Sequence, residues 1–268
     1  MECVVGRLPV HYVEHGDGTP VLVLHGAGDD HREVLVVLEP VFEHLTGYRR
    51  IYPDLPGMGR TPAPRSVRGS DDVLAVLLGL VDALVGGDDF VLVGHSAGAY
   101  LAQAMAAVRP QQVAGLALLC PLGETVADLP GHRAVRVSPE LHALAGSDDP
   151  EFRGYFVVQT PSTLERYRQA VAPAIPLVDA AAMDRIGEHW RLSALAEDGP
   201  SYPNPALIVV GRQDSIVGYA GPWQLVERYP RATFAVLDRA GHALPHEQPL
   251  LLGSLVEEWL SRVQEHTG

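Results

Sequence analysis

The sequence predicts an α/β fold, in which a mostly parallel β-sheet is flanked by helices on both faces and carries an inserted helical cap. Short apolar runs alternate with longer helix-forming segments, which is typical of helices that connect parallel strands. Each run is apolar throughout, as expected for strands covered on both faces. Residues 121–205 interrupt this alternation and are too many for a plain connection between two strands.

Length and composition agree with one large core that carries an insertion. The chain has 268 residues, of which 47% are hydrophobic and 20% are charged. These proportions are typical of a globular enzyme. We therefore assign residues 1–120 and 206–268 to an α/β core and residues 121–205 to a helical cap.

Charge and residue usage exclude several classes of function. The net charge of −13 disfavours binding to nucleic acid or to anionic membranes. Every basic residue is arginine, which excludes Schiff-base and pyridoxal phosphate enzymes because both need a lysine. The first residues lack the pattern of a signal peptide, and the most apolar helix candidate, residues 73–85, is too short to span a bilayer. We expect a cytoplasmic protein that acts on a small molecule, and the oligomeric state stays open.

Neither the cysteines nor the histidines form a metal-binding pattern. Cys3 and Cys120 are far apart in sequence, and Cys120 ends an apolar run as a small core residue would. His11 and His15 have the spacing of zinc ligands on a helix, but on the expected strand they lie more than about 10 Å apart. We therefore expect neither a metal ion nor an organic cofactor.

The first half of the core follows from its apolar runs and capping residues. Asp29 or Asp30 would cap one helix, and Ser70-Asp71-Asp72 would cap the next. The expected strands are residues 3–15, as a hairpin at a sheet edge, then 20–24, 50–53, 90–93 and 113–120, and the expected helices are residues 31–46, 70–85 and 97–107.

The rest of the chain contains the insert and then the end of the core. Prolines are frequent in the insert, and regular alternation returns with a β-branched run at residue 206. The expected helices are residues 162–172, 179–195, 222–229 and 249–265, and the expected strands are residues 206–210 and 233–237.

The clearest chemical signal is Gly94-His95-Ser96-Ala97-Gly98, which connects the strand at 90–93 to an Ala- and Leu-rich helix. A serine on so sharp a turn is held in strained backbone torsions, and the close strand and helix leave no room for side chains at the two glycines. The unpaired N–H groups at the start of the helix favour negative charge near Ser96. A plain turn serine is the competing interpretation.

Three residue types that form a catalytic triad follow one another along the chain. Ser96, Asp214 and His242 each come just after a predicted strand. Because the carboxyl ends of parallel strands lie along one edge of a sheet, we expect these residues to converge there.

The sequence resembles the α/β-hydrolase superfamily in several independent places. The resemblance covers residues 20–120 and 205 to the end, and the insert falls where this family carries its variable cap. The matching segments are His25-Gly26-Ala27-Gly28, Asp54-Leu55-Pro56-Gly57-Met58-Gly59, Gly94-His95-Ser96-Ala97-Gly98, Gly211-Arg212-Gln213-Asp214 and Gly241-His242.

The resemblance implies a role for each matching residue. Ser96 would be the nucleophile, His242 the base that takes its proton, and Asp214 the group that orients the imidazole. The backbone N–H groups of Ala27 and Ala97 would form the oxyanion hole. The resemblance also places His95 and Met58 in the substrate pocket and gives His25 a structural role.

Alternatives remain open for two members of the triad. Glu124 is a rival acid because some members of the superfamily place the acid after the preceding strand. His246 and His95 compete with His242 as the base, although the strand-exit position and the preceding glycine favour His242.

The resulting hypothesis is a serine hydrolase that cleaves a small ester, thioester, amide or activated carbonyl through an acyl-enzyme intermediate. A serine at the elbow argues against dehalogenases and epoxide hydrolases, which carry aspartate there. Carbon–carbon bond hydrolysis or a lyase step could use the same triad, and a non-catalytic small-molecule receptor is a third possibility. A carboxylate-bearing substrate would draw on arginines of the insert, which are Arg133, Arg136, Arg153, Arg166, Arg168, Arg185 and Arg191.

Overall fold

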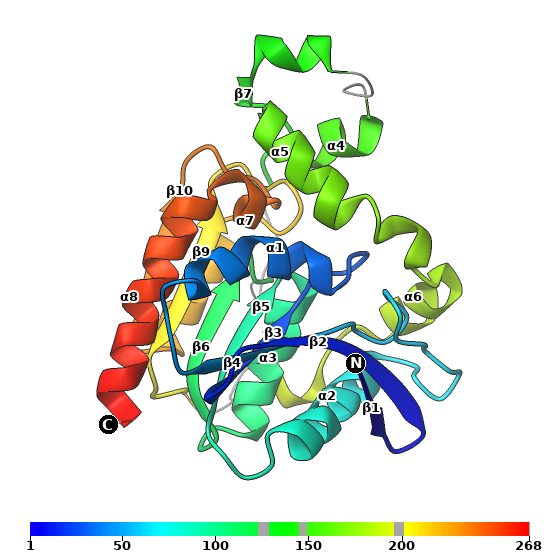
Figure 1. The fold of residues 1–268 in the computed structure, drawn as a ribbon, viewed down its shortest axis with the longest axis vertical. Coiled ribbons are helices and arrows are strands. Elements are labelled where there is room, and N and C mark those ends of the chain that lie inside the picture. Colours follow the sequence, from blue (N-terminus) through cyan, green and yellow to red (C-terminus); the bar gives the residue numbers. More distant parts are fainter. Residues whose placement is uncertain (123–128, 145–148, 196–200, 268) are drawn as a thin grey trace.

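A sheet of eight strands forms the centre of the structure, a computed structural model that describes residues 1–122, 129–144, 149–195 and 201–267 (Figure 1). The strand order is β1-β2-β4-β3-β5-β6-β9-β10. The hairpin strands β1 and β2 are antiparallel to each other, β2 is antiparallel to β4, and the remaining pairs are parallel. The bounds are β1 (Glu2–Val5), β2 (Leu8–His15), β3 (Thr19–Leu24), β4 (Tyr48–Pro53), β5 (Phe90–His95), β6 (Val113–Leu119), β9 (Ala206–Gly211) and β10 (Ala232–Leu237). The predicted α/β class with a mostly parallel sheet is confirmed.

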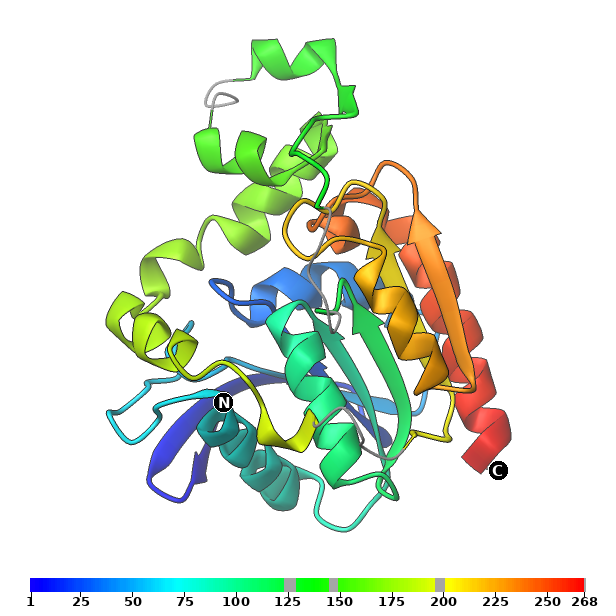
Figure 2. The same ribbon diagram turned by 180° about the vertical axis from the view of Figure 1, so that it is seen from behind.

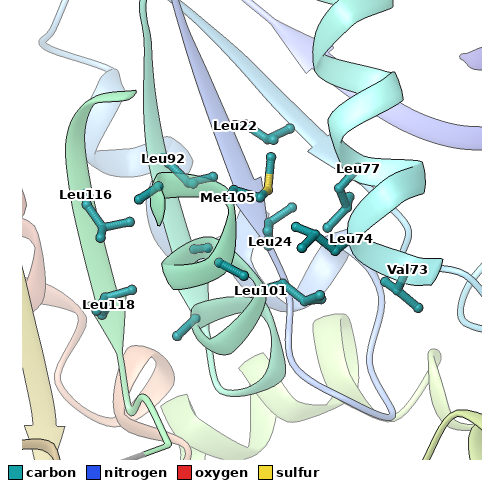
Figure 3. Packing of buried hydrophobic residues seen from close by; sticks show 14 of the residues in the cluster. Leu22, Leu24, Val73, Leu74, Leu77, Leu92, Leu101, Met105, Leu116 and Leu118 are labelled. Atoms are coloured by element: carbon teal, nitrogen blue, oxygen red, sulfur yellow. The ribbon is translucent and has the colours of Figure 1, made fainter. Parts of the chain in front are cut away.

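Helices cover both faces of the sheet because both faces are apolar. Val21 and Val23 of β3 pack with α1 (His31–Phe42) and α8 (Pro249–Thr267). Leu22 and Leu24, which point to the opposite face, pack with α2 (Ser70–Leu84) and α3 (Ala97–Val108), as Figure 3 shows. This alternation along one strand builds a three-layer core.

Helix ends in the core follow local capping chemistry. Asp30 caps α1 by accepting a hydrogen bond from the Arg32 amide at 3.0 Å. The expected cap of α2 is wrong: Gly69 is the N-cap residue and makes no side-chain bond. The Asp71 carboxylate instead accepts the Ser193 amide, so tertiary contact determines its partner.

The described part of the segment between β6 and β9 contains short elements, most of which lie on the side toward which the parallel strands point, while its last turn runs down beside α3 (Figures 1 and 2). These are β7 (Arg136–Val137), a 3₁₀ turn (Pro139–Ala143), α4 (Pro150–Tyr155), β8 (Val158–Gln159), α5 (Pro161–Arg166), a π-helical turn (Tyr167–Val171), a 3₁₀ turn (Ile175–Leu177), α6 (Ala180–Gly187) and a 3₁₀ turn (Ser193–Leu195). The helix expected at 179–195 therefore ends at Gly187. Phe152, Phe156, Leu164 and Tyr167 form a small apolar cluster of their own.

The strands on either side of this segment are direct neighbours. Leu116 of β6 pairs with Ala206 of β9, and Leu119 pairs with Val209. A 3₁₀ helix (Gly221–Glu227) stands where an α-helix was expected, and α7 (Leu244–Glu247) follows β10. Across the described residues, every helix is too short or too polar to cross a membrane.

Candidate active site

Ser96 lies at the sharp turn between β5 and α3, and its backbone is strained. Its φ of 52° and ψ of −117° place a non-glycine residue in a region that favours glycine. A Cβ on Gly94 would lie 2.4 Å from the Gly98 carbonyl oxygen, and a Cβ on Gly98 would lie 2.4 Å from the Leu24 carbonyl oxygen. The two glycines therefore allow the strand and helix to approach closely enough to hold Ser96 at the tip.

Ser96, His242 and Asp214 form a hydrogen-bonded line at this edge of the sheet. His242 Nε2 lies 2.8 Å from Ser96 Oγ, and His242 Nδ1 lies 2.8 Å from Asp214 Oδ2. Asp214 is fully buried. Burial opposes ionisation of Asp214, but hydrogen bonds with His242 and with the amides of Val217 and Ile216 lower its pKa overall. The carboxylate thus stays ionised and fixes the imidazole tautomer.

The backbone N–H groups expected to bind an oxyanion are those of Ala27 and Ala97. The amides on either side of Ala27 already donate hydrogen bonds within the protein. The Gly26 amide donates to Glu33 Oε2 at 3.3 Å, and the Gly28 amide donates to Met58 Sδ at 3.3 Å. Within the described residues, no hydrogen bond uses the N–H groups of Ala27 and Ala97. Ala27 is exposed, and Ala97 begins α3 beside Ser96. Both groups are therefore free to donate to a ligand.

A cavity of about 350 Å³ opens over this arrangement. The core contributes the turn at residues 26–29, His95, Ser96, Ile216 and His242, and the insert contributes Glu151, Tyr155, Tyr167, Val171 and Ile175. Its size suits a small molecule. A larger cavity, of about 630 Å³, is lined by Arg68, Trp190 and neighbouring residues and contains none of the triad.

The cavity includes one of the two residues expected to line a pocket. His95 contributes to its wall, whereas Met58 is absent from the described lining. Met58 is buried beside the cavity turn, and its sulfur accepts the Gly28 hydrogen bond. Its place in the substrate pocket stays a prediction.

A family model described as the alpha/beta hydrolase fold matches residues 19–249. This chain belongs to the α/β-hydrolase family. The solved structure of an alpha/beta superfamily hydrolase from Oenococcus oeni superimposes with a TM-score of 0.89 and 27% identity, and the match covers 98% of this chain and 99% of that one.

Curated relatives of this α/β-hydrolase have several named activities. The biotin biosynthesis bifunctional protein BioHC of Cellvibrio japonicus is 31% identical over 90% of this chain, which spans 47% of that relative's length. The 2-hydroxy-6-oxo-2,4-heptadienoate hydrolase of Pseudomonas putida is 26% identical, and the match covers 96% of this chain and 95% of that one. Other relatives are named as esterases and epoxide hydrolases, so the chain is a hydrolase of a family with several substrates.

The two rival histidines occupy other places in the hydrolase. Glu124 lies outside the described residues. His246 is buried in α7, and its Nε2 lies 3.9 Å from Glu33 Oε1. Burial lowers the pKa of His246 to about 4. His95 Nε2 donates to the His242 backbone carbonyl at 3.0 Å, so His95 contacts the loop that carries His242.

Glu33, which the sequence did not single out, contacts both the turn at Gly26 and His95. Its carboxylate accepts the Gly26 amide, and its Oε1 lies 2.7 Å from His95 Nδ1. Burial opposes charge on both side chains, but their ion pair lowers the pKa of Glu33 to about 2 and raises that of His95 to about 8. Glu33 is in the first turn of α1, where a glutamate is usually a solvated partner of the helix dipole. No sequence pattern distinguishes a first-turn glutamate that faces inward.

Glu247 connects the insert to the residue that precedes His242. Its Oε1 accepts the amides of Val157 and Val158 at 2.6 and 2.9 Å, and its Oε2 accepts the Gly241 amide at 2.6 Å. Burial raises the pKa of Glu247 to about 7, and the three N–H donors oppose this rise. One side chain thus holds the segment beside β8 against the residue that precedes His242.

Two histidines also surround the carboxylate of Asp54, which directly follows β4. His11 Nδ1 lies 2.9 Å from Asp54 Oδ2, and His31 Nδ1 lies 2.7 Å from Oδ1. The amides of His31 and Arg60 also donate to this carboxylate. These ligand-type atoms lie within 4.8 Å of one another, as do those of His95, Cys120 and His242. The atoms around Asp54 are already hydrogen-bonded to one another. The other group includes His242, whose imidazole also contacts Ser96 and Asp214.

Proposed function

We propose that this hydrolase cleaves a small ester, thioester or amide through an acyl-enzyme intermediate, with Ser96 as nucleophile, His242 as base and Asp214 as orienting acid. The observation that carries the proposal is the 2.8 Å contact between His242 Nε2 and Ser96 Oγ, with Asp214 on the other ring nitrogen. A serine hydroxyl is a weak nucleophile unless a base can accept its proton in this geometry.

The reaction follows from these positions in two halves. Ser96 Oγ attacks the substrate carbonyl while His242 Nε2 takes its proton, and the Ala27 and Ala97 N–H groups bind the oxyanion. The tetrahedral intermediate then expels its leaving group, which receives the proton from His242. Water attacks the acyl-enzyme with His242 again as base, and this step releases the acid and restores Ser96.

Residues 121–205 act as a cap over the core of residues 1–120 and 206–268 in this proposal. Two observations support the division. Among the described residues, the apolar cluster around Phe152 and Tyr167 takes only Ala243 from the core. Five of its side chains also line the cavity above Ser96. The cap would then set which substrates fit, while the core supplies the chemistry.

Carbon–carbon bond hydrolysis on the same triad is a second candidate, favoured by the relative named as a dienoate hydrolase that matches along almost its whole length. Such a substrate carries a carboxylate. None of the insert's arginines lines the cavity in the part of the chain that the structure describes, which favours the ester reaction. Turnover of a coloured dienoate ketone, without turnover of nitrophenyl esters, would favour the second candidate.

A fluorophosphonate probe tests the nucleophile directly, because it reacts only with an activated serine. We expect it to label the native protein and the matched control Ser254→Ala, whose serine is an exposed residue on α8, and to leave Ser96→Ala unlabelled. Equal labelling of Ser96→Ala would refute the assignment.

A further inference from the structure

The charged groups around the cavity are unevenly distributed by sign. Two carboxyl side chains, Asp29 and Glu151, line it. Among the described lining residues there is no arginine, and the only groups that can carry positive charge are His95 and His242. A substrate that enters the cavity therefore meets acidic groups and two imidazoles.

The positive charge of His95 is already committed to another partner. Its Nδ1 lies 2.7 Å from the buried carboxylate of Glu33, and its Nε2 donates to the His242 carbonyl. His95 Nδ1 thus lies within ion-pair distance of Glu33, and its Nε2 is occupied by a backbone carbonyl. The His95–Glu33 pair as a whole is neutral and offers no charge to a ligand.

Asp29 presents a carboxyl group close to the reacting serine. Its Oδ2 and Ser96 Cβ lie 3.6 and 3.4 Å from the position that a Cβ on Gly26 would take. Asp29 is only 7% exposed, and no described residue donates a hydrogen bond to its side chain. Burial and the nearby Glu33 raise the pKa of Asp29 well above its ordinary value. An anion placed here would be desolvated without a compensating cation.

Arginines near the cavity bind other groups. Arg166 of α5 donates to the His246 carbonyl at 2.9 Å. Arg32 of α1 pairs with Asp30 and donates to the Pro173 carbonyl. Glu151 is an exposed residue of the cavity lining, and its Oε2 lies 3.3 Å from the Tyr167 hydroxyl, which also contacts Asp149 Oδ1 at 3.1 Å. Val171, Ile175 and Ile216 complete an otherwise apolar wall.

We propose that this cavity selects substrates whose acyl group carries no negative charge. The inference rests on the proposed ester hydrolysis and adds to it the class of substrate, a small neutral acyl group without a free carboxylate. Glu151 supplies the negative charge, and the lack of an arginine among the described lining residues leaves an anionic acyl group without a partner.

Two nitrophenyl esters of equal chain length test this inference. 4-Nitrophenyl butyrate and the 4-nitrophenyl monoester of succinic acid differ only in a terminal methyl or carboxylate group. We expect kcat/KM for butyrate to exceed that for the succinate monoester by about 100-fold, since burying an unpaired charge costs about that factor. Assays in 0.5 M salt, where the Debye length is about 4 Å, remove long-range repulsion by the net charge of the protein.

Four variants separate a local effect of the cavity from a general one. Glu151→Gln should lower the butyrate-to-succinate ratio by about threefold, and Ile175→Arg, at a residue that is 39% exposed, should lower it by about tenfold by supplying a cation. Ile175→Gln and Glu188→Gln, the latter in the larger cavity away from Ser96, should leave the ratio unchanged.

The outcomes distinguish this inference from the proposed function. Butyrate and succinate esters turned over within threefold of each other by the native protein would overturn it, as would an unchanged ratio in Ile175→Arg. Absence of turnover of both esters, together with absence of fluorophosphonate labelling, would instead overturn the serine hydrolase mechanism on which it rests.

Discussion

Two carboxylates at the same edge of the sheet bind imidazoles in almost the same way, but only one of these imidazoles contacts a serine hydroxyl among the described residues. Asp214 follows β9 and binds His242 Nδ1 at 2.8 Å, and Asp54 follows β4 and binds the Nδ1 atoms of His31 and His11 at 2.7 and 2.9 Å. Both carboxylates are fully buried. The difference lies on the far side of each ring, because His242 Nε2 meets the Ser96 hydroxyl in a cavity.

A carboxylate–imidazole pair is therefore not by itself evidence of catalysis. Around Asp54 the pair shapes the chain: the carboxylate also accepts two backbone amides and ties β2, α1 and the loop after β4 together. Around Asp214 the pair leaves the second ring nitrogen of His242 2.8 Å from the Ser96 hydroxyl, as the proposed mechanism needs. The deciding feature is the group that the second ring nitrogen reaches.

The largest expected effect is loss of catalysis in Asp214→Asn. An amide at this position favours the wrong imidazole tautomer, so kcat should fall by roughly 10⁴-fold. The circular dichroism spectrum should stay native. Measured kcat for a nitrophenyl ester within tenfold of the native value would mean that Asp214 does not orient the base.

Asp54→Asn should show the opposite pattern. Burial opposes ionisation of Asp54, but its hydrogen bonds with His31 and with the Arg60 amide lower its pKa. The pair thus stabilises the fold above the ordinary aspartate pKa and loses this contribution as the pH falls below it. We expect the free energy of unfolding, measured in urea at pH 7, to fall by about 3 to 5 kcal/mol, with kcat reduced by less than about tenfold. A loss of activity without loss of stability would contradict the structural role.

Glu247→Gln tests a buried carboxylate that binds backbone amides and no imidazole. A glutamine would turn an NH₂ group toward at least one buried amide, and the loss of a hydrogen bond to a charged group costs about 3 kcal/mol. Urea unfolding measures this cost. Glu257→Gln, on the exposed surface of α8, is the matched control and should change stability by less than about 0.5 kcal/mol.

A third carboxylate–imidazole pair, Glu33–His95, should make stability depend on pH. The pKa of His95 is about 8, above the ordinary value of 6.5, so the pair stabilises the fold fully below pH 6.5 and this contribution is lost as the pH rises through 8. The loss corresponds to about 2 kcal/mol. Urea unfolding at pH 6.5 and 8.5 should show it in the native protein and not in His95→Gln. The same change in both proteins would rule out His95 as its source.

The sequence predicted the core well because its signals are local. Apolar runs marked the strands, and the glycines around Ser96 marked a turn whose steric demands are set by neighbours in the chain. The convergence of Ser96, Asp214 and His242 followed from strand polarity alone. Each of these inferences needs only the periodicity of the chain and the direction of the strands.

The residues that the sequence missed depend on tertiary contacts. Glu33 becomes a buried ion-pair partner only because α1 packs beside the turn at Gly26, and Asp71 loses its capping role to Ser193. Met58 follows a turn motif, and its sulfur accepts a hydrogen bond from the Gly28 amide, a contact that the motif does not indicate. Helix ends in the insert were also misplaced, since short elements there depend on packing with the core more than on propensity.

The pairing of β6 with β9 has a consequence for how this scaffold can change. The insert leaves the sheet at one strand and returns at its direct neighbour, so the strands pair in the same way whatever length of chain is looped out between them. A replacement segment would need to recreate the contacts that hold the present one, among them those with Glu247, the His246 carbonyl and Arg32. Substrate selectivity can therefore change by exchange of this segment while the sheet edge that carries Ser96, Asp214 and His242 stays the same.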